Sequence, residues 1–219
     1  MNAQFGRLAI TAFGIFFAGA AVANNPLTVP NNGTSVFFTG SNALTLGGGG
    51  TLDASLSDTF STSTFSGSIE SRVYSGDANN AYGGLTFAYQ VTMDPNISGD
   101  VAHVSLNGLF DNPVDAAYDP GSTGGWVIPV SADEPTPYGS GVAFDLTAPS
   151  LSAGATSAWL MVYTGMNGYG RDSASLQDGL NTSANILAPI PEPESIAMLI
   201  TGLGLMGFIA RRRKRSLGA

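Results

Sequence analysis

The chain has 219 residues and no cysteine, which excludes disulfides, thiolate nucleophiles and cysteine-ligated metal clusters. Eight Lys and Arg side chains against 16 Asp and Glu give a formal net charge of −8. The imbalance is larger in residues 24–190, where Arg72 and Arg171 are the only basic side chains and the net charge is −12. A body this acidic cannot hold a phosphate backbone, so nucleic acid is excluded as a partner. At 167 residues the body is the size of one domain.

Residues 1–23 have the three parts of a secretory signal peptide. Arg7 supplies the positive start, residues 8–20 are uncharged and apolar, and Ala21 and Ala23 form an A-x-A cleavage site. This order favours a signal over the alternative, a short buried helix. We therefore expect an N-terminal signal helix, cleavage before Asn24 and export of the mature protein.

Residues 185–219 are expected to be a linker followed by a three-part membrane signal. Pro191, Glu192 and Pro193 form a helix-breaking element, because proline fixes φ and has no N–H. Residues 196–210 are uncharged and apolar, and as a helix they would extend ~22 Å, a marginal single transmembrane span. The basic residues after them would stop translocation and keep the tail in the cytoplasm, which leaves the body outside. The span includes Ile196, Leu199, Gly202, Leu203, Gly204 and Ala210, and the stop-transfer cluster is Arg211, Arg212, Arg213, Lys214 and Arg215.

This tail resembles the PEP-CTERM sorting signal of Gram-negative bacteria, which is also catalogued as an ice-binding protein C-terminal domain. The resemblance rests on residues 191–193, on the Leu/Gly-rich segment 199–204 and on the basic cluster 211–215. It implies recognition by an exosortase, a membrane-embedded cysteine protease or transpeptidase. It also implies transient residence in the inner membrane, removal of the tail and delivery to the cell surface or to the exopolysaccharide matrix of a biofilm. Glu192 is then part of a substrate and not a catalytic acid.

Within the body, residues 24–184 are expected to form the folded domain, and they have the pattern of strands and turns. In residues 85–93 the apolar side chains alternate with polar ones, as in a strand with one buried face, whereas residues 158–163 are continuously apolar, as in a strand covered on both faces. The glycine run 47–50 is expected to be a flexible loop. Further strands are expected at residues 36–39, 51–57, 65–74, 101–110, 126–130 and 142–146.

We therefore predict an all-β fold, an antiparallel β-sandwich or jelly roll of roughly eight strands, flanked by the signal helix and the single transmembrane helix. The stretch from Ser66 to Thr164 also resembles exosortase-substrate ectodomains of unassigned activity. That resemblance carries no functional residues to this chain.

His103 is the only histidine. Ala102, Val104 and Leu106 form the apolar side of its segment, so His103 is expected to point outward with Ser105. A surface residue is the favoured interpretation, and a general base or ligand is the alternative. No G-x-S-x-G sequence places a serine nucleophile, and we predict no catalytic residues.

The segment 94–100 is the one sequence with calcium-loop spacing. Asp94, Asn96, Ser98 and Asp100 carry oxygen side chains, and glycine stands at the sixth position. The twelfth position is Ser105, where a calcium loop has a bidentate glutamate, and the same residue types are common in turns. We expect a hairpin turn between Met93 and Val101, with a weak calcium site as the alternative and no other cofactor.

A second acidic loop is expected at Asp111, Asp115 and Asp119, where divalent cations could associate loosely. Trp126 is expected in the core and Tyr138 in a loop. If exposed, either ring could stack on a sugar.

Together these features predict a non-enzymatic exported protein of the cell surface or exopolysaccharide matrix, processed by an exosortase. A carbohydrate- or ice-binding module is the first alternative, and it requires an exposed flat row of threonine or aromatic side chains. A secreted hydrolase is the second, and it requires converging carboxylates or a Ser/His pair in a cleft.

Overall fold

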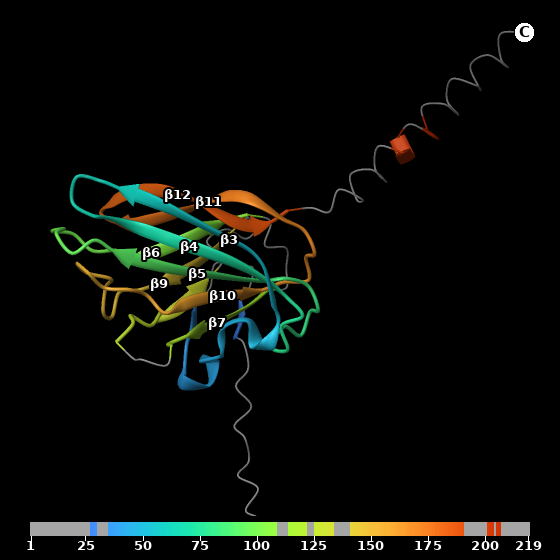
Figure 1. The fold of residues 1–219 in the computed structure, drawn as a ribbon, viewed down its shortest axis with the longest axis horizontal. Coiled ribbons are helices and arrows are strands. Elements are labelled where there is room, and N and C mark those ends of the chain that lie inside the picture. Colours follow the sequence, from blue (N-terminus) through green and yellow to red (C-terminus); the bar gives the residue numbers. More distant parts are fainter. Residues whose placement is uncertain are drawn as a thin grey trace, which may run out of the picture.

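The computed structural model describes residues 27–29, 35–108, 114–121, 125–133, 141–190, 201–203 and 205–206. Within these ranges the chain folds into two six-stranded sheets (Figure 1). Sheet A has the strand order β1-β7-β10-β5-β4-β3, and sheet B has the order β12-β11-β6-β9-β8-β2. All pairings between these strands are antiparallel, which confirms the predicted antiparallel all-β fold.

The strands differ widely in length, and two short 3-10 helices, η1 (Gly40–Asn42) and η2 (Leu46–Gly49), precede the first long one. The strands are β1 (Leu27–Val29), β2 (Val36–Phe37), β3 (Thr51–Ser61), β4 (Ser66–Ser75), β5 (Thr86–Met93), β6 (His103–Asn107), β7 (Val114–Asp119), β8 (Ser131–Asp133), β9 (Gly141–Asp145), β10 (Trp159–Tyr163), β11 (Tyr169–Asp178) and β12 (Leu180–Pro189).

The main core lies between the two sheets, because alternate side chains of each strand point inward. On β6, Val104 and Leu106 are fully buried, whereas the residues between and beside them face outward. Tyr89 of sheet A crosses this core and donates a hydrogen bond from its hydroxyl to Leu187 O of β12, at 2.8 Å. Complete burial raises the pKa of the Tyr89 hydroxyl well above its ordinary value, so the donor stays protonated.

A second apolar cluster covers the outer side of sheet A. Leu160 and Val162 of β10 pack in the main core, while Trp159, Met161 and Tyr163 of the same strand pack in this second cluster with Leu44 and Tyr74. The predicted strand at residues 158–163, covered on both faces, is therefore confirmed. The outer cover comes from the segment that contains η2 and from side chains such as Tyr82 and Trp126.

The sandwich is closed along one edge by contact between β3 of sheet A and β12 of sheet B, which lie side by side (Figure 1). At the other edge of the sandwich, the edge strand β1 of sheet A contacts the edge strand β2 of sheet B. The chain thus passes from sheet A to sheet B within its first two strands.

Several sequence expectations were wrong in detail. The strand expected at residues 36–39 is only Val36–Phe37. The strand expected at 126–130 is reduced to one isolated bridge between Val127 and Ser157, since Pro129 has no N–H to pair. The linker expected from residue 185 is wrong as far as Pro189, because β12 pairs with β11 along its whole length.

The expected signal helix and the expected transmembrane helix fall almost entirely outside the described residues. The residues of the expected signal peptide, including Ala21 and Ala23, lie outside the described residues. The same holds for residues 191–200 and 207–219. Thr201–Leu203 and Leu205–Met206 are helical, and their side chains are exposed. Among the residues that the structure describes, none lies in a helix with the length and apolar character needed for a membrane span.

Candidate functional site

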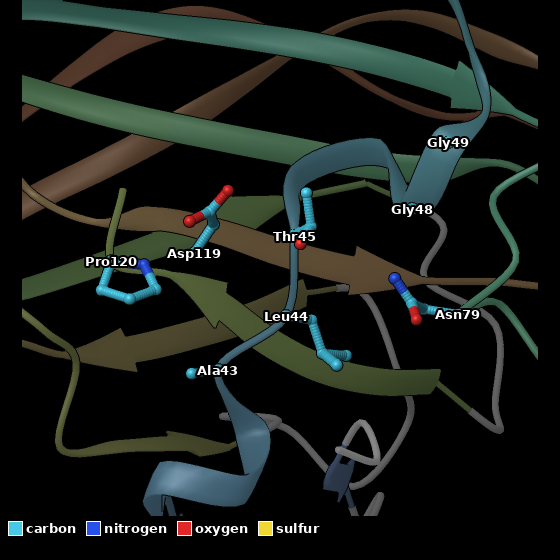
Figure 2. A pocket seen from close by; sticks show the side chains of 8 residues that line it. All are labelled: Ala43, Leu44, Thr45, Gly48, Gly49, Asn79, Asp119 and Pro120. Atoms are coloured by element: carbon cyan, nitrogen blue, oxygen red, sulfur yellow. The ribbon is translucent and has the colours of Figure 1, made fainter. Parts of the chain in front are cut away.

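A pocket lies beside the second apolar cluster, on the outer side of sheet A. It has a volume of about 700 Å³. Figure 2 shows Asp119 and Pro120 on one side of it and Asn79 on the other, with Leu44 and Thr45 between them. Ala43, Gly48 and Gly49 complete the lining. The pocket is therefore built from three segments: the stretch around η2, the end of β7 and the connection from β4 to β5.

The glycine run that borders the pocket is a defined turn, so the expectation of a flexible loop was wrong. Gly47, Gly48 and Gly49 all have positive φ, with values of 70°, 47° and 83°. A Cβ atom on Gly47 would lie 2.7 Å from the Tyr74 ring, and one on Gly48 would lie 1.9 Å from Asp77 Oδ1. Glycine is required here both for the left-handed backbone and for the close approach of these side chains.

Asp77 lies directly behind Gly48 and is only 6% exposed. Its Oδ1 accepts a hydrogen bond from Asn79 N at 2.8 Å, whereas its Oδ2 has no hydrogen-bond partner among the described residues. The neighbouring Asn80 is also buried, and its Nδ2 donates to Gly84 O and Thr164 O. The segment that carries these side chains is thus held against the end of β10.

Asp119 forms the other wall and holds the local backbone. Its Oδ2 accepts a hydrogen bond from Leu46 N, and its Oδ1 accepts one from Gly121 N, both at 2.8 Å. Both carboxylate oxygens therefore anchor the loops that form the pocket. The first of these bonds fixes η2 to the end of β7.

The pocket region is electrostatically negative. Burial raises the pKa of the Tyr163 hydroxyl above its ordinary value. The negative charges of Asp77, Asp119 and Asp115 raise this pKa further. Tyr82 donates a hydrogen bond to Asp115 Oδ1 at 2.8 Å, and burial together with this bond raises the pKa of Tyr82 to about 12. Both phenols therefore stay neutral near pH 7. Across the described ranges, no three His, Asp or Glu side chains are grouped so that they could hold a metal ion.

Asp115 and Asp119 belong to strand β7, so the expectation of an acidic loop at these positions was wrong. Asp115 is 9% exposed, because sheet A and the Tyr82 ring enclose it. The alternation of apolar and polar side chains at these positions is too weak to predict the strand, since Ala116 and Ala117 have small side chains. Asp111 and Tyr138 lie outside the described residues.

Trp126 is half-buried and packs against the second apolar cluster, as its expected core role requires. A Cβ atom on Gly121 would lie 2.6 Å from its ring, so the glycine makes room for the indole.

His103 points outward from β6, as predicted, with Val104 and Leu106 on the buried side. Its Nδ1 lies 4.0 Å from Asp145 Oδ1 of the neighbouring strand β9, and the two residues are register partners. Half of the His103 side chain is exposed. The histidine is therefore a surface residue beside one carboxylate.

Segment 94–100 connects sheet A to sheet B, so the expected hairpin between Met93 and Val101 was wrong. Asp94 Oδ2 accepts a hydrogen bond from Ser66 Oγ, and Asp100 Oδ2 accepts one from Ser150 Oγ. The backbone N–H groups of Ser98 and Gly99 donate to Thr64 O. The loop is thus tied to two other segments, and a weak calcium site at Asp94, Asn96, Ser98 and Asp100 stays the alternative to a plain turn.

Sequence reasoning missed the segment from Asp77 to Asn80, which contributes two buried polar side chains, Asp77 and Asn80, beside the pocket. Its signal was present as a cluster of Asp and Asn between two strands, which is typical of a turn stabilised by side-chain to backbone hydrogen bonds. What could not be inferred was that the turn folds back over β10.

The described body is an antiparallel β-sandwich whose last strand ends at Pro189. The tail defines the class of protein more closely, because residues 189–214 match the family model of the PEP-CTERM protein-sorting motif. The chain therefore carries a PEP-CTERM sorting motif, as the resemblance indicated. No curated protein and no solved structure matches the chain.

The motif implies export from a Gram-negative cell and a C-terminal membrane-anchoring signal that an exosortase sorts. The chain is thereby marked as a substrate of another enzyme. The matched range includes residues 191–193 and most of the basic cluster, which lie outside the described residues.

Proposed function

We propose that this protein is a non-catalytic component of the cell surface or the exopolysaccharide matrix, and that an exosortase delivers it there. The observation that carries the proposal is the sorting motif at residues 189–214. It begins where β12 ends, so the sandwich and the signal adjoin without a spacer domain. Removal of the tail after this point would leave both sheets complete.

The arrangement of the polar side chains supports a structural role for the sandwich. Asp119 uses both of its oxygens to hold backbone N–H groups, and Asp94 and Asp100 are each bonded to a serine hydroxyl. His103 lies beside Asp145 on an open sheet face. The three aspartates stabilise loops, and the pocket in Figure 2 is lined by Asp119, whose two oxygens are already bonded, and otherwise by small polar and apolar side chains.

The test is the intact mass of the protein recovered from membranes and from culture medium, in hosts with and without an exosortase. We expect a form that starts near Asn24 and ends close to Pro191, released only when the exosortase is present. Glu192→Ala should abolish release, whereas Glu194→Ala, a matched change two residues later, should leave it unchanged. A full-length tail in the membrane of both hosts would refute the proposal.

A carbohydrate-binding role for the same protein is favoured by one further observation, the composition of the outer face of sheet B.

A further inference from the structure

Sheet B has one face in the main core and one face turned away from it. Inward side chains such as Val104, Leu106 and Leu176 are fully buried. The residues that alternate with them point away from the core, since successive side chains of a strand lie on opposite faces. We call the outward residues of β6, β9, β11 and β12 the polar face.

The polar face is ordered in rows, because the register aligns its side chains across four strands. One row consists of Asn181, Gln177, His103 and Asp145. The next consists of Ser183, Ser175, Ser105 and Ala143. Ser173 and Asn107 lie in the row after it, beside Asn185 and Gly141, and Asn107 Nδ2 donates a hydrogen bond to Ser173 Oγ at 3.1 Å. Neighbouring strands repeat these groups every ~4.8 Å.

Hydrogen bonds within the polar face hold its side chains in place before any ligand arrives. Ser175 Oγ donates to Asn181 Oδ1 at 2.6 Å and accepts from Gln177 Nε2 at 3.2 Å. These contacts already restrict the side chains, so less side-chain entropy is lost when a ligand binds. At the β9 side, His103, Ala143 and Asp145 help to line a hollow of about 120 Å³.

The polar face carries few charges on a strongly acidic protein, and they balance. Asp145 is its one carboxylate, with His103 4.0 Å away, and Arg171, exposed on β11 beyond Ser173, is its one arginine. The exposed side of sheet A differs, since β3 and β4 present Asp53, Glu70 and Arg72 there. Amides and hydroxyls both donate and accept hydrogen bonds, and desolvating them costs far less than desolvating charges.

This chemistry fits a hydroxyl-rich, uncharged polymer better than a protein. Protein interfaces have buried aromatic or arginine anchors near their centre. The centre of the polar face consists of Ser105 and Ser175, whose side chains are small. The aromatic ring that shares the outward side of β11 is Tyr169, which lies at the end of the strand and is 39% exposed, so it can stack on a terminal sugar.

We propose that the polar face of sheet B binds an uncharged polysaccharide chain. The proposal rests on the proposed function, since it supplies the contact by which a matrix protein would hold its matrix. The aligned amides and hydroxyls pair with sugar hydroxyls, and the balance of one arginine against one carboxylate gives a polyanion no net attraction to the face.

The test is electrophoresis of the exported protein through native gels that contain hydroxyethylcellulose or dextran, with alginate as a polyanionic comparator. The acidic body moves toward the anode, so binding appears as retardation. Ser105→Arg places a long charged side chain in the centre of the polar face and leaves the Ser175 hydrogen bonds intact. Ser57→Arg is the matched control, since Ser57 is an exposed residue of β3 on the other sheet.

We expect at least one uncharged polymer to retard the wild type and Ser57→Arg equally. Ser105→Arg should bind at least about tenfold more weakly, a difference of ~1.4 kcal/mol. Equal retardation of the two variants, stronger retardation by alginate, or no retardation by either uncharged polymer would overturn the inference. Exosortase-dependent release is measured separately, so it can hold while the polar face fails to bind.

Discussion

Asp58 of β3 accepts two hydrogen bonds from Asn185 of β12, one from the backbone N at 2.8 Å and one from Nδ2 at 2.6 Å. The two residues lie on the edge strands of different sheets. Their contact therefore joins sheet A to sheet B along the edge where β3 and β12 pack. It also satisfies a backbone N–H on the outer side of β12, which would otherwise be free to pair with another chain.

The Asp58 contact predicts a pH dependence of stability. The backbone hydrogen bond from Asn185 has the largest effect on the Asp58 carboxyl, and its side-chain hydrogen bond the next largest; both lower the pKa of this carboxyl below its ordinary value. A lowered folded-state pKa means that the stabilisation is present above pH ~4 and is lost as pH falls through the folded pKa. Asp58→Ala should therefore lower Tm at pH 7 and flatten the fall of Tm below pH ~4.

Thermal melts at several pH values measure this effect. Asp53→Ala is the control on the same strand, because Asp53 accepts one hydrogen bond from Ser75 Oγ within sheet A. It should change Tm less than Asp58→Ala does. Identical Tm profiles for Asp58→Ala and the wild type would show that the contact between the sheets contributes nothing.

Ser71 joins the same two sheets from the inside. Its side chain donates to Leu56 O and accepts a hydrogen bond from Leu187 N at 3.0 Å, and the residue is 1% exposed. Ser71→Ala would leave the Leu187 N–H buried without a partner, so we expect a loss of about 1–3 kcal/mol in the free energy of unfolding. Urea denaturation measures it, with Ser68→Ala, a half-buried position on β4, as a control expected within about 0.5 kcal/mol of the wild type. Equal losses for the two variants would contradict the role of Ser71.

Strong alternation was enough to predict the long central strands from the sequence. Residues 85–93 alternate large apolar and polar side chains, and β5 forms there. Strands β11 and β12 were not predicted because most of their outward residues are Ser, Asn or Gln and several inward ones are alanine, so the contrast between the faces is small. These polar outward residues also form the polar face. The composition that made the two strands hard to predict is therefore the composition of the proposed polysaccharide-binding surface.

The pocket could not be predicted because it depends on contacts between distant segments. Asp119 and Leu46 are 73 positions apart, and their hydrogen bond follows from the packing of η2 against β7. Glycine repeats on their own do not reveal whether a loop is free or fixed. Here the turn is fixed, because the Tyr74 and Asp77 side chains lie directly against Gly47 and Gly48.

The fixed glycine turn predicts different costs for two adjacent substitutions. Gly49→Ala meets no atom within 4 Å, so only its positive φ of 83° opposes it, at about 1 kcal/mol. Gly48→Ala would add a clash with Asp77 Oδ1 at 1.9 Å to a similar backbone cost, for a loss of about 3 kcal/mol or more. Urea denaturation of the two variants tests this ranking. Similar losses would mean that the turn is free to move away from Asp77.

The loop 94–100 supports a prediction about calcium. Asp94 is bonded to Ser66 at the start of β4, and Asp100 is bonded to Ser150 in the segment before the Leu151 bridge. Because the two carboxylates are held by different segments, we expect that ~1 mM calcium, a concentration at which weak extracellular sites fill, leaves Tm unchanged. Asp94→Asn should then have the same Tm with and without calcium. A rise in Tm with calcium that Asp94→Asn abolishes would show instead that the ion displaces the serine hydroxyls, since only a ligand of the folded state stabilises it.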